Sequence, residues 1–385
     1  MQTFDTTPSI MTSGGVLGRR RHVLATAIAV VGRDRSWRNA LVALAACLTM
    51  LISAYRSTVV SMLYTWSEDP FGHGYFVVPA VLCLAFMRRS ALDSITPRAA
   101  ASALPAVVAS SLAWLLATLA GHEAIQQAAV VATAVSLTWA VLGTAALRTL
   151  AFPLGLLLFA LPVGHVVAPE LQDFTGRVAA AMLRYSRVSV ALADDVISTA
   201  GTRWHVSEAC GGIHYLIASA AIGYVYAGLV YRRWTRRAAF MAAAIIVPIV
   251  GNLVRVYTTI VLDEFGATRL VAGMGHYLYG VFVFMVMMTV LFMTCGQWSD
   301  ARCSDGSPPR RRPDGAAVPP WRSAALVTLA LSLAVAPPLV TAAFIDSPNL
   351  LRRLSTLVEH PGHLTGAVAN ARDRRVDAAF WTRVL

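Results

Sequence analysis

The chain has 385 residues, of which 57% are hydrophobic and 14% charged, and its mean hydropathy is +0.61. This composition excludes an ordinary soluble domain, and near-continuous apolar runs of about 20 residues predict an all-α, polytopic helical membrane protein. The net charge is +12, and every basic residue is an arginine. These arginines cluster in short loops between apolar runs, which is typical of topology signals at an anionic membrane face and not of nucleic-acid binding.

The first part of the chain consists of a basic tail and five expected membrane spans. Residues 1–38 are expected to form a cytoplasmic tail. They do not read as a cleavable signal peptide, because the apolar piece from His22 to Val31 is short and has arginine on both sides. The spans are expected over residues 40–55, 75–87, 101–120, 125–142 and 150–167. The fifth contains Pro153 and Pro162, which membrane helices tolerate when neighbouring helices satisfy the freed carbonyl groups.

After the fifth expected span, the distribution of apolar and charged residues changes. From Pro169 to Ala200, apolar residues recur at helical spacing while charged residues take the other faces, which predicts an amphipathic helix at the membrane interface. Further spans are expected over residues 213–230, 240–262, 277–294 and 324–344, the last one after a linker rich in proline and arginine at 296–322. The sequence therefore predicts about eight or nine transmembrane helices, with a main domain at 39–295 and a final segment, 323–385, that ends in a non-cytoplasmic tail.

Arginine counting predicts the orientation of these spans. With a cytoplasmic N-terminus, the N-terminal tail and the inner loops hold 19 arginines, and the outer loops between the spans hold six. The outer ones are Arg56, Arg177, Arg184, Arg187, Arg203 and Arg269. Because positive charge is retained on the cytoplasmic side, the N-terminus is expected inside.

Cys210 is the candidate nucleophile. Cys47, Cys83 and Cys295 fall in apolar runs, where a small buried side chain is the ordinary interpretation. Cys210 instead stands between a polar loop and the start of a span, followed by Gly211 and Gly212, which leave the backbone open to a substrate. A helix N-terminus would lower the pKa of this thiol and increase its thiolate fraction. A structural filler at a helix start is the alternative.

Two further residues are expected at the same depth on the outer side. Arg255 lies inside an apolar span, where a charged side chain is costly and indicates function unless it snorkels to the surface. Asn252 lies one turn away on about the same face. His276 begins a later span, and its imidazole can exchange protons near neutral pH. Alone it would be an ordinary interfacial residue.

A metal site is a second interpretation of the cysteine segment. His205, Glu208, Cys210 and His214 are close in sequence, and the last two share a helix face. Their spacing matches no zinc pattern, and one segment would have to fold around the ion. No metal or other cofactor is therefore expected.

The segment Glu208-Ala209-Cys210-Gly211-Gly212-Ile213, the later Asn252 and Arg255, and Gly275-His276 resemble the three motifs of the exosortase/archaeosortase family. The turn from Phe71 to Tyr75, with Pro79 and Arg88-Arg89, resembles an early block of bacterial exosortases. The resemblance covers roughly residues 40–295. One departure is Gly211, because the usual family motif has serine after the cysteine.

The resemblance implies a membrane cysteine peptidase or transpeptidase of the bacterial inner membrane. Such enzymes process exported precursors that carry a short motif such as Pro-Glu-Pro, one transmembrane helix and a basic end. Cys210, Arg255 and His276 would be catalytic, with the active site on the periplasmic side. The residues expected to contact substrate are His73, Trp204, Glu208, Gly211, Gly212, His214 and Asn252.

A transporter or lipid-linked flippase is the alternative function. Many apolar spans with few charges also fit that class. It predicts polar residues at several membrane depths, whereas here they gather near the outer face. Besides the sorting signals, the only partner expected is the lipid bilayer.

Overall fold

In the computed structural model, the described residues are 35–67, 71–162, 164–193, 196–199, 202–205, 211–266, 274–296 and 320–342. Within these ranges the side chains of residues 165, 166, 274–277, 296, 320 and 321 are not described. The described part is mainly helical and contains seven helices long and apolar enough to cross a membrane. Two shorter apolar helices cover Gly74–Met87 and Thr144–Ala160. The expected all-α, polytopic membrane fold is confirmed.

The first half of the fold is a group of helices that includes the expected spans one to five. Its elements are α2 (Arg35–Ala54), α3 (Arg56–Ser67), α4 (Gly74–Met87), α5 (Arg89–Leu92), η1 (Ala101–Ala103), α6 (Leu104–Ala120), α7 (Glu123–Leu142), α8 (Thr144–Gly155) and η2 (Leu156–Ala160). Spans two to four match the prediction within two residues. The first span continues after a break at Tyr55, and the fifth begins at Thr144, so that Arg148 is an exposed helix residue instead of a loop residue.

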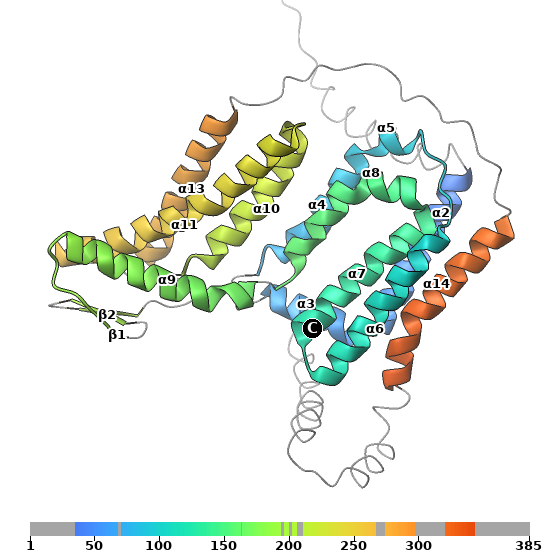
Figure 1. Ribbon diagram of the computed structural model, residues 1–385, viewed down its shortest axis with the longest axis horizontal. Coiled ribbons are helices and arrows are strands. Elements are labelled where there is room, and N and C mark those ends of the chain that lie inside the picture. The colour runs from blue at the N-terminus through green and yellow to red at the C-terminus, as the bar shows by residue number, and fades with distance from the viewer. Residues whose placement is uncertain are drawn as a thin grey trace, which may run out of the picture.

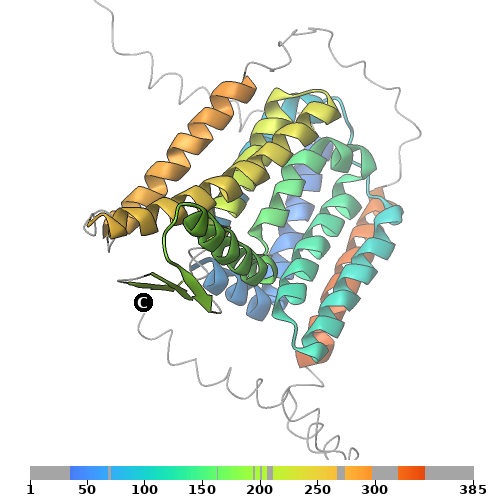
Figure 2. The ribbon, with the colours of Figure 1, turned by 60° about the vertical axis from the view of Figure 1, so that its left-hand side comes forward.

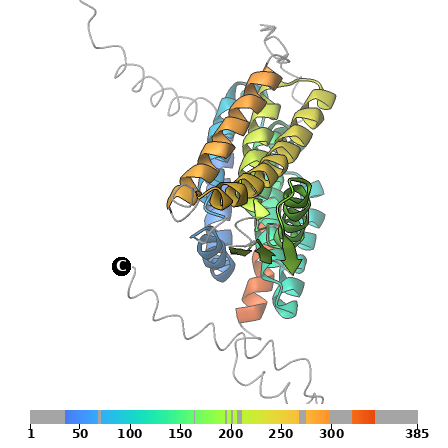
Figure 3. The same ribbon diagram turned by 90° about the vertical axis from the view of Figure 1, so that its left-hand side faces the viewer.

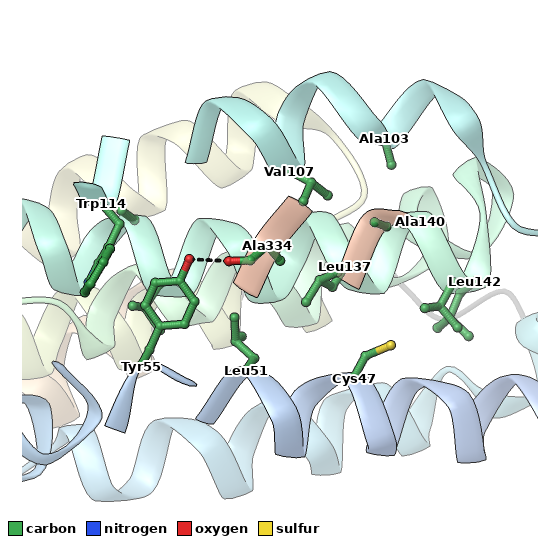
Figure 4. Close-up of a cluster of buried hydrophobic side chains, with 14 of the residues drawn as sticks. Cys47, Leu51, Tyr55, Ala103, Val107, Trp114, Leu137, Ala140, Leu142 and Ala334 are labelled. Atoms are coloured by element: carbon green, nitrogen blue, oxygen red, sulfur yellow. Dashed lines mark hydrogen bonds between the residues drawn. The ribbon is translucent and has the colours of Figure 1, made fainter. Parts of the chain in front are cut away.

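The last helix, α14 (Pro320–Val340), packs against α2, α6 and α7. Its small Ala330 and Ala334 are fully buried, which lets the helix backbone approach the others closely. The phenol of Tyr55 donates a hydrogen bond of 2.6 Å to the carbonyl of Ala334 (Figure 4). The indole of Trp114 donates one of 2.9 Å to the hydroxyl of Thr58. These polar contacts join helices that are far apart in the sequence.

The second half is a group of three long helices beside the first. Its members are α10 (Ile213–Val230), α11 (Trp234–Glu264) and α13 (Met274–Gly296). Helices α10 and α11 approach closely at Gly223, where an added Cβ would lie 2.7 Å from the Cβ of Ala244. Helix α13 packs along α11 (Figure 3). Helix α14 lies on the far side of the molecule, beside α6 (Figure 2).

Pro248 interrupts the hydrogen bonding inside α11. A proline has no N–H, so the carbonyl four residues earlier, that of Ala244, loses its usual helix partner. The hydroxyl of Ser219 on α10 donates a hydrogen bond of 2.6 Å to this carbonyl. Both Ser219 and Ala244 are fully buried. A side chain on a neighbouring helix therefore satisfies the group that the proline leaves open, as membrane interiors require.

The amphipathic segment differs from the prediction. Helix α9 (Gly164–Tyr185) begins earlier than expected and ends well before Ala200. A small antiparallel sheet follows, with strands β1 (Ala191–Ala193), β2 (Val196–Ser198) and β3 (Arg203–His205) in the order β1-β2-β3. Residues 191–193 and 196–198 were expected to belong to the amphipathic helix, and this was wrong, because they form strands. Strands of three residues are too short to show alternation in the sequence.

Helix α9 crosses one end of the second half of the bundle (Figure 1). The α4–α5 junction, with Arg88 and Arg89, is at the opposite end of the molecule (Figure 1). The α10–α11 turn, with Arg232 and Arg233, is at that same end. Inner arginines were expected to share one side, and the fold brings these four to the same end. Which side of the membrane that end faces stays a prediction.

Candidate functional site

The predicted site begins where the chain enters α10. Cys210 and Glu208 lie outside the described residues, and the description resumes at Gly211. Gly212 precedes the helix with a φ of +82°, in the left-handed region that favours glycine. A Cβ at this position would lie 2.5 Å from Cγ of Asn252. The backbone two residues after Cys210 is therefore in direct contact with a side chain of α11.

Gly211 contacts a different helix. A Cβ at this position would lie 3.3 Å from both the Cα and the backbone nitrogen of Gln172 on α9. Gly211 and Gly212 are both buried. The glycine pair thus lies between α9 and α11, and its lack of side chains allows both helices to approach.

Arg255 is buried on α11, with 4% of its surface exposed. It lies one helical turn after Asn252, which is also 4% exposed, so the two share a face. Its Nη1 donates a hydrogen bond of 3.3 Å to the phenol oxygen of Tyr215 on α10. The guanidinium carbon lies 5.4 Å from the centre of the Tyr215 ring, within the range of a cation–π interaction. Tyr215 in turn stacks on Phe284 of α13, with ring centres 5.2 Å apart.

The guanidinium of Arg255 has two further nitrogen donors. Nε and Nη2 are buried and have no hydrogen-bond partner among the described residues. The ion pair between Arg177 and Asp173 lies within α9 and does not involve Arg255. A buried cation without a carboxylate partner is costly. It is, however, arranged to bind a negative charge that arrives or develops beside it.

Helix α13 closes the site opposite Arg255. A Cβ at Gly280 would lie 2.9 Å from Nη1 of Arg255 and would overlap the phenol oxygen of Tyr215. His276 lies in the first turn of the same helix, four residues before Gly280, and residues four apart share a helix face. The side chain of His276 is not described. The helix that carries it therefore touches the guanidinium one turn further along.

Two of the remaining predicted residues have other surroundings. His73, at the start of α4, is half-buried, and its Nε2 lies 2.9 Å from the carbonyl oxygen of Phe159. Trp204, in β3, packs against a buried cluster that includes Leu183 of α9 and Val256 and Ile260 of α11. Its indole Nε1 is buried without a partner among the described residues. Trp204 thus joins the sheet to the helices that frame the site.

His205 and His214 complete the predicted set. His205 is exposed at the end of β3, and His214 is half-buried in the first turn of α10. No group of three or more histidine, cysteine, aspartate or glutamate side chains that could hold a metal ion occurs within the described ranges. The metal hypothesis also involves Glu208 and Cys210, so it stays untested.

Three residues of this region were not predicted from the sequence: Tyr215, Gly280 and Gln172. Gly280 had a signal, since it follows His276 by one turn. A glycine on the face of a candidate catalytic residue indicates a close approach by another group. Tyr215 and Gln172 had none, because their roles depend on how α9, α10 and α11 pack.

Comparison with known proteins gives a match to one family. The model of one family, the transmembrane exosortases, matches residues 65–293, which is more than half of the chain. The match includes α9, the glycine pair, Asn252, Arg255 and α13, and it leaves out α2 and α14. No curated protein and no solved structure matches the chain.

Proposed function

The chain belongs to the transmembrane exosortase family, a family of membrane sorting proteases and transpeptidases, and on this premise we propose that it cleaves C-terminal sorting signals through a thioester on Cys210. Its substrates are exported precursors that carry a short motif, a transmembrane helix and a basic end. The active site faces the periplasm from the bacterial inner membrane. The observation that carries the proposal is the buried Arg255, which has two guanidinium donors without partners among the described residues.

The reaction has two steps. The Cys210 thiolate attacks the scissile carbonyl, the C–N bond breaks, and the amine leaves with a proton that His276 supplies. A second amine, or water, then gives a proton back to His276 and attacks the thioester, whose C–S bond breaks to release the thiolate. Transpeptidation follows in the first case and hydrolysis in the second.

Arg255 stabilises the oxyanion that forms in each step. Its Nη1 is held by Tyr215, while Nε and Nη2 remain available to an oxygen of the substrate. Removing one preorganised donor of this kind raises the activation free energy by about 3–4 kcal/mol. Burial strengthens the effect, because the surrounding helices exclude water from the charge.

Covalent connection supports the placement of the nucleophile near this group. Cys210 is joined to Gly211 by one peptide bond, so their Cα atoms are about 3.8 Å apart. Gly212 contacts Asn252, which is three residues before Arg255 on the same helix. His276 is four residues before Gly280, whose missing side chain leaves room for the guanidinium.

Cleavage of a reporter tests the proposal. The full-length protein and a membrane-anchored reporter ending in Pro-Glu-Pro, a transmembrane helix and arginines are produced together, and cleavage is followed on a gel. Cys210→Ala should abolish cleavage, and mass spectrometry of the wild type should find a reporter fragment attached to Cys210 that hydroxylamine releases.

The other cysteines of the chain provide the controls. Cys47 and Cys295 are buried, as expected, whereas Cys83 is exposed on the surface of α4, contrary to its expected burial. Cys83→Ala should therefore cleave at the wild-type rate. Unchanged cleavage by Cys210→Ala, at equal amounts in the membrane, would rule out the thioester mechanism.

A further inference from the structure

A cavity of about 310 Å³ lies at the end of the second helix group opposite to Arg255. Tyr231, Phe240 and Cys295 form its buried side, and Ala239 and Ala243 line it along α11. Thr235 and Arg236, in the first turn of α11, complete the lining. Arg236 and Arg255 are 19 residues apart on one helix, which corresponds to about 29 Å. The cavity is therefore separate from the proposed active site.

The buried side of the cavity is held in place by direct contacts. The phenol of Tyr231 donates a hydrogen bond of 2.6 Å to the carbonyl of Cys295, which joins the end of α10 to the end of α13. The ring of Phe240 lies 5.6 Å from that of Tyr231 and 4.8 Å from that of Tyr226. Packed aromatic rings have few alternative rotamers, so the hollow is formed before any ligand enters.

The stretch of chain that carries Arg236 is strongly basic. Arg232, Arg233, Arg236 and Arg237 fall within six consecutive residues, and the chain has no aspartate or glutamate between Glu208 and Asp263. Arg237 is engaged through its Nε, which donates 2.7 Å to the carbonyl of Tyr231. Arg236 is half-buried and lines the cavity. The local positive charge is therefore not balanced by acidic residues of α10 or of the first seven turns of α11.

The ring of Trp234 is 78% exposed beside this cluster. Exposed tryptophan side chains are typical of the boundary between headgroups and acyl chains. An exposed tryptophan next to arginines is the pattern expected at the headgroup level, and the small side chains of Ala239 and Ala243 follow from there along α11.

We propose that this cavity binds an anionic phospholipid of the surrounding leaflet. The lipid phosphate lies against Arg236 and the hydroxyl of Thr235, and the start of one acyl chain lies over Ala239 and Ala243. A planar guanidinium can donate two hydrogen bonds to one phosphate. Basic pockets between membrane helices recognise anionic headgroups in this way. Arginines that serve only as topology signals need to be exposed and need no cavity. That role therefore does not explain why Arg236 lines a hollow.

Lipid retention tests the proposal. The full-length protein is purified in detergent and titrated with phosphatidylglycerol or phosphatidylcholine, and bound lipid is counted by native mass spectrometry. The wild type should retain phosphatidylglycerol in preference to phosphatidylcholine. Arg236→Gln should weaken that binding about tenfold, the usual effect of losing a charge-assisted hydrogen bond.

Two further variants separate the cavity from the charge. Arg148→Gln removes the same charge from an exposed position on α8 and should bind like the wild type. Ala243→Phe keeps every charge, fills the hollow and should weaken binding; thermal melting confirms that each variant is folded. Equal losses for Arg236→Gln and Arg148→Gln, or equal retention of both lipids, would overturn the proposal.

A soluble phosphate source is distinguished in the same experiment. Glycerol 3-phosphate carries the same charged group without acyl chains. It should not displace the lipid at millimolar concentration. Displacement would show that the site recognises a free phosphate compound, and the lipid assignment would fall.

Discussion

Gly212 and Asn252 touch each other across the gap between the loop before α10 and the interior of α11. The glycine has a φ of +82°, and an added Cβ would lie 2.5 Å from Cγ of Asn252. Two separate constraints, one conformational and one steric, therefore exclude other residues at position 212. The two constraints can be measured separately.

Gly212→Ala should lose both stability and reporter cleavage. Gly121→Ala is the matched control, because Gly121 has a φ of +73° and no atom within 4 Å of an added Cβ. The control should cost only the conformational term, about 1 kcal/mol. The apparent melting temperature in detergent should fall further for Gly212→Ala. Equal losses in the two variants would show that the contact with Asn252 is unimportant.

Arg255→Met should abolish reporter cleavage while leaving stability unchanged or higher. The buried guanidinium has two donors without described partners, and replacing a poorly compensated buried charge by an apolar side chain of similar size is often stabilising, by about 1–4 kcal/mol. Cleavage and melting are measured on the same preparations, with the exposed Arg148→Met as a control that should match the wild type. A large drop in melting temperature for Arg255→Met would instead assign Arg255 a structural role.

Gly211→Ser introduces the residue that the related motif usually has. The added Cβ would be 3.3 Å from the backbone of Gln172, so α9 would have to move by a few tenths of an ångström. We expect a small loss of stability, about 1 kcal/mol, and equal behaviour of Gly211→Ala, since both variants add the same Cβ. Higher cleavage by the serine variant than by the alanine variant would show that the hydroxyl group contributes to the reaction.

Ser219→Ala should destabilise the protein by about 1–3 kcal/mol, because it leaves the buried carbonyl of Ala244 without a donor. Pro248→Ala restores an N–H to that carbonyl from within α11. The serine substitution should therefore cost much less in the Pro248→Ala background, and a double-mutant cycle of melting temperatures measures the difference. Additive effects would mean that Ser219 and Pro248 act independently.

Most spans could be predicted from the sequence, because apolar runs of membrane length are a strong signal. The span expected at residues 213–230 coincides with α10, and the span expected at residues 101–120 coincides with η1 and α6. The extension of the first span beyond Tyr55 was missed, since Arg56 suggested an end there; its side chain is exposed and does not stop the chain from continuing as a helix.

The site could be predicted only in part. A charged residue in an apolar span singled out Arg255, and its burial beside Asn252 agrees with a functional interpretation. The partner of the guanidinium could not be found in this way. Tyr215 is an ordinary aromatic residue of an apolar helix, and its contact with Arg255 exists only because α10, α11 and α13 meet there.

The hydrogen bond between Tyr55 and Ala334 joins positions that are 279 residues apart. It follows that the first half of the bundle is assembled around a helix that leaves the ribosome well after α2, α6 and α7. Until then, the surfaces of α2, α6 and α7 that later contact α14 must be covered by lipid or by the insertion machinery. Release of the chain before residue 320 would therefore yield a protein that contains α10, α11 and α13 and has an unfilled seam between α2, α6 and α7.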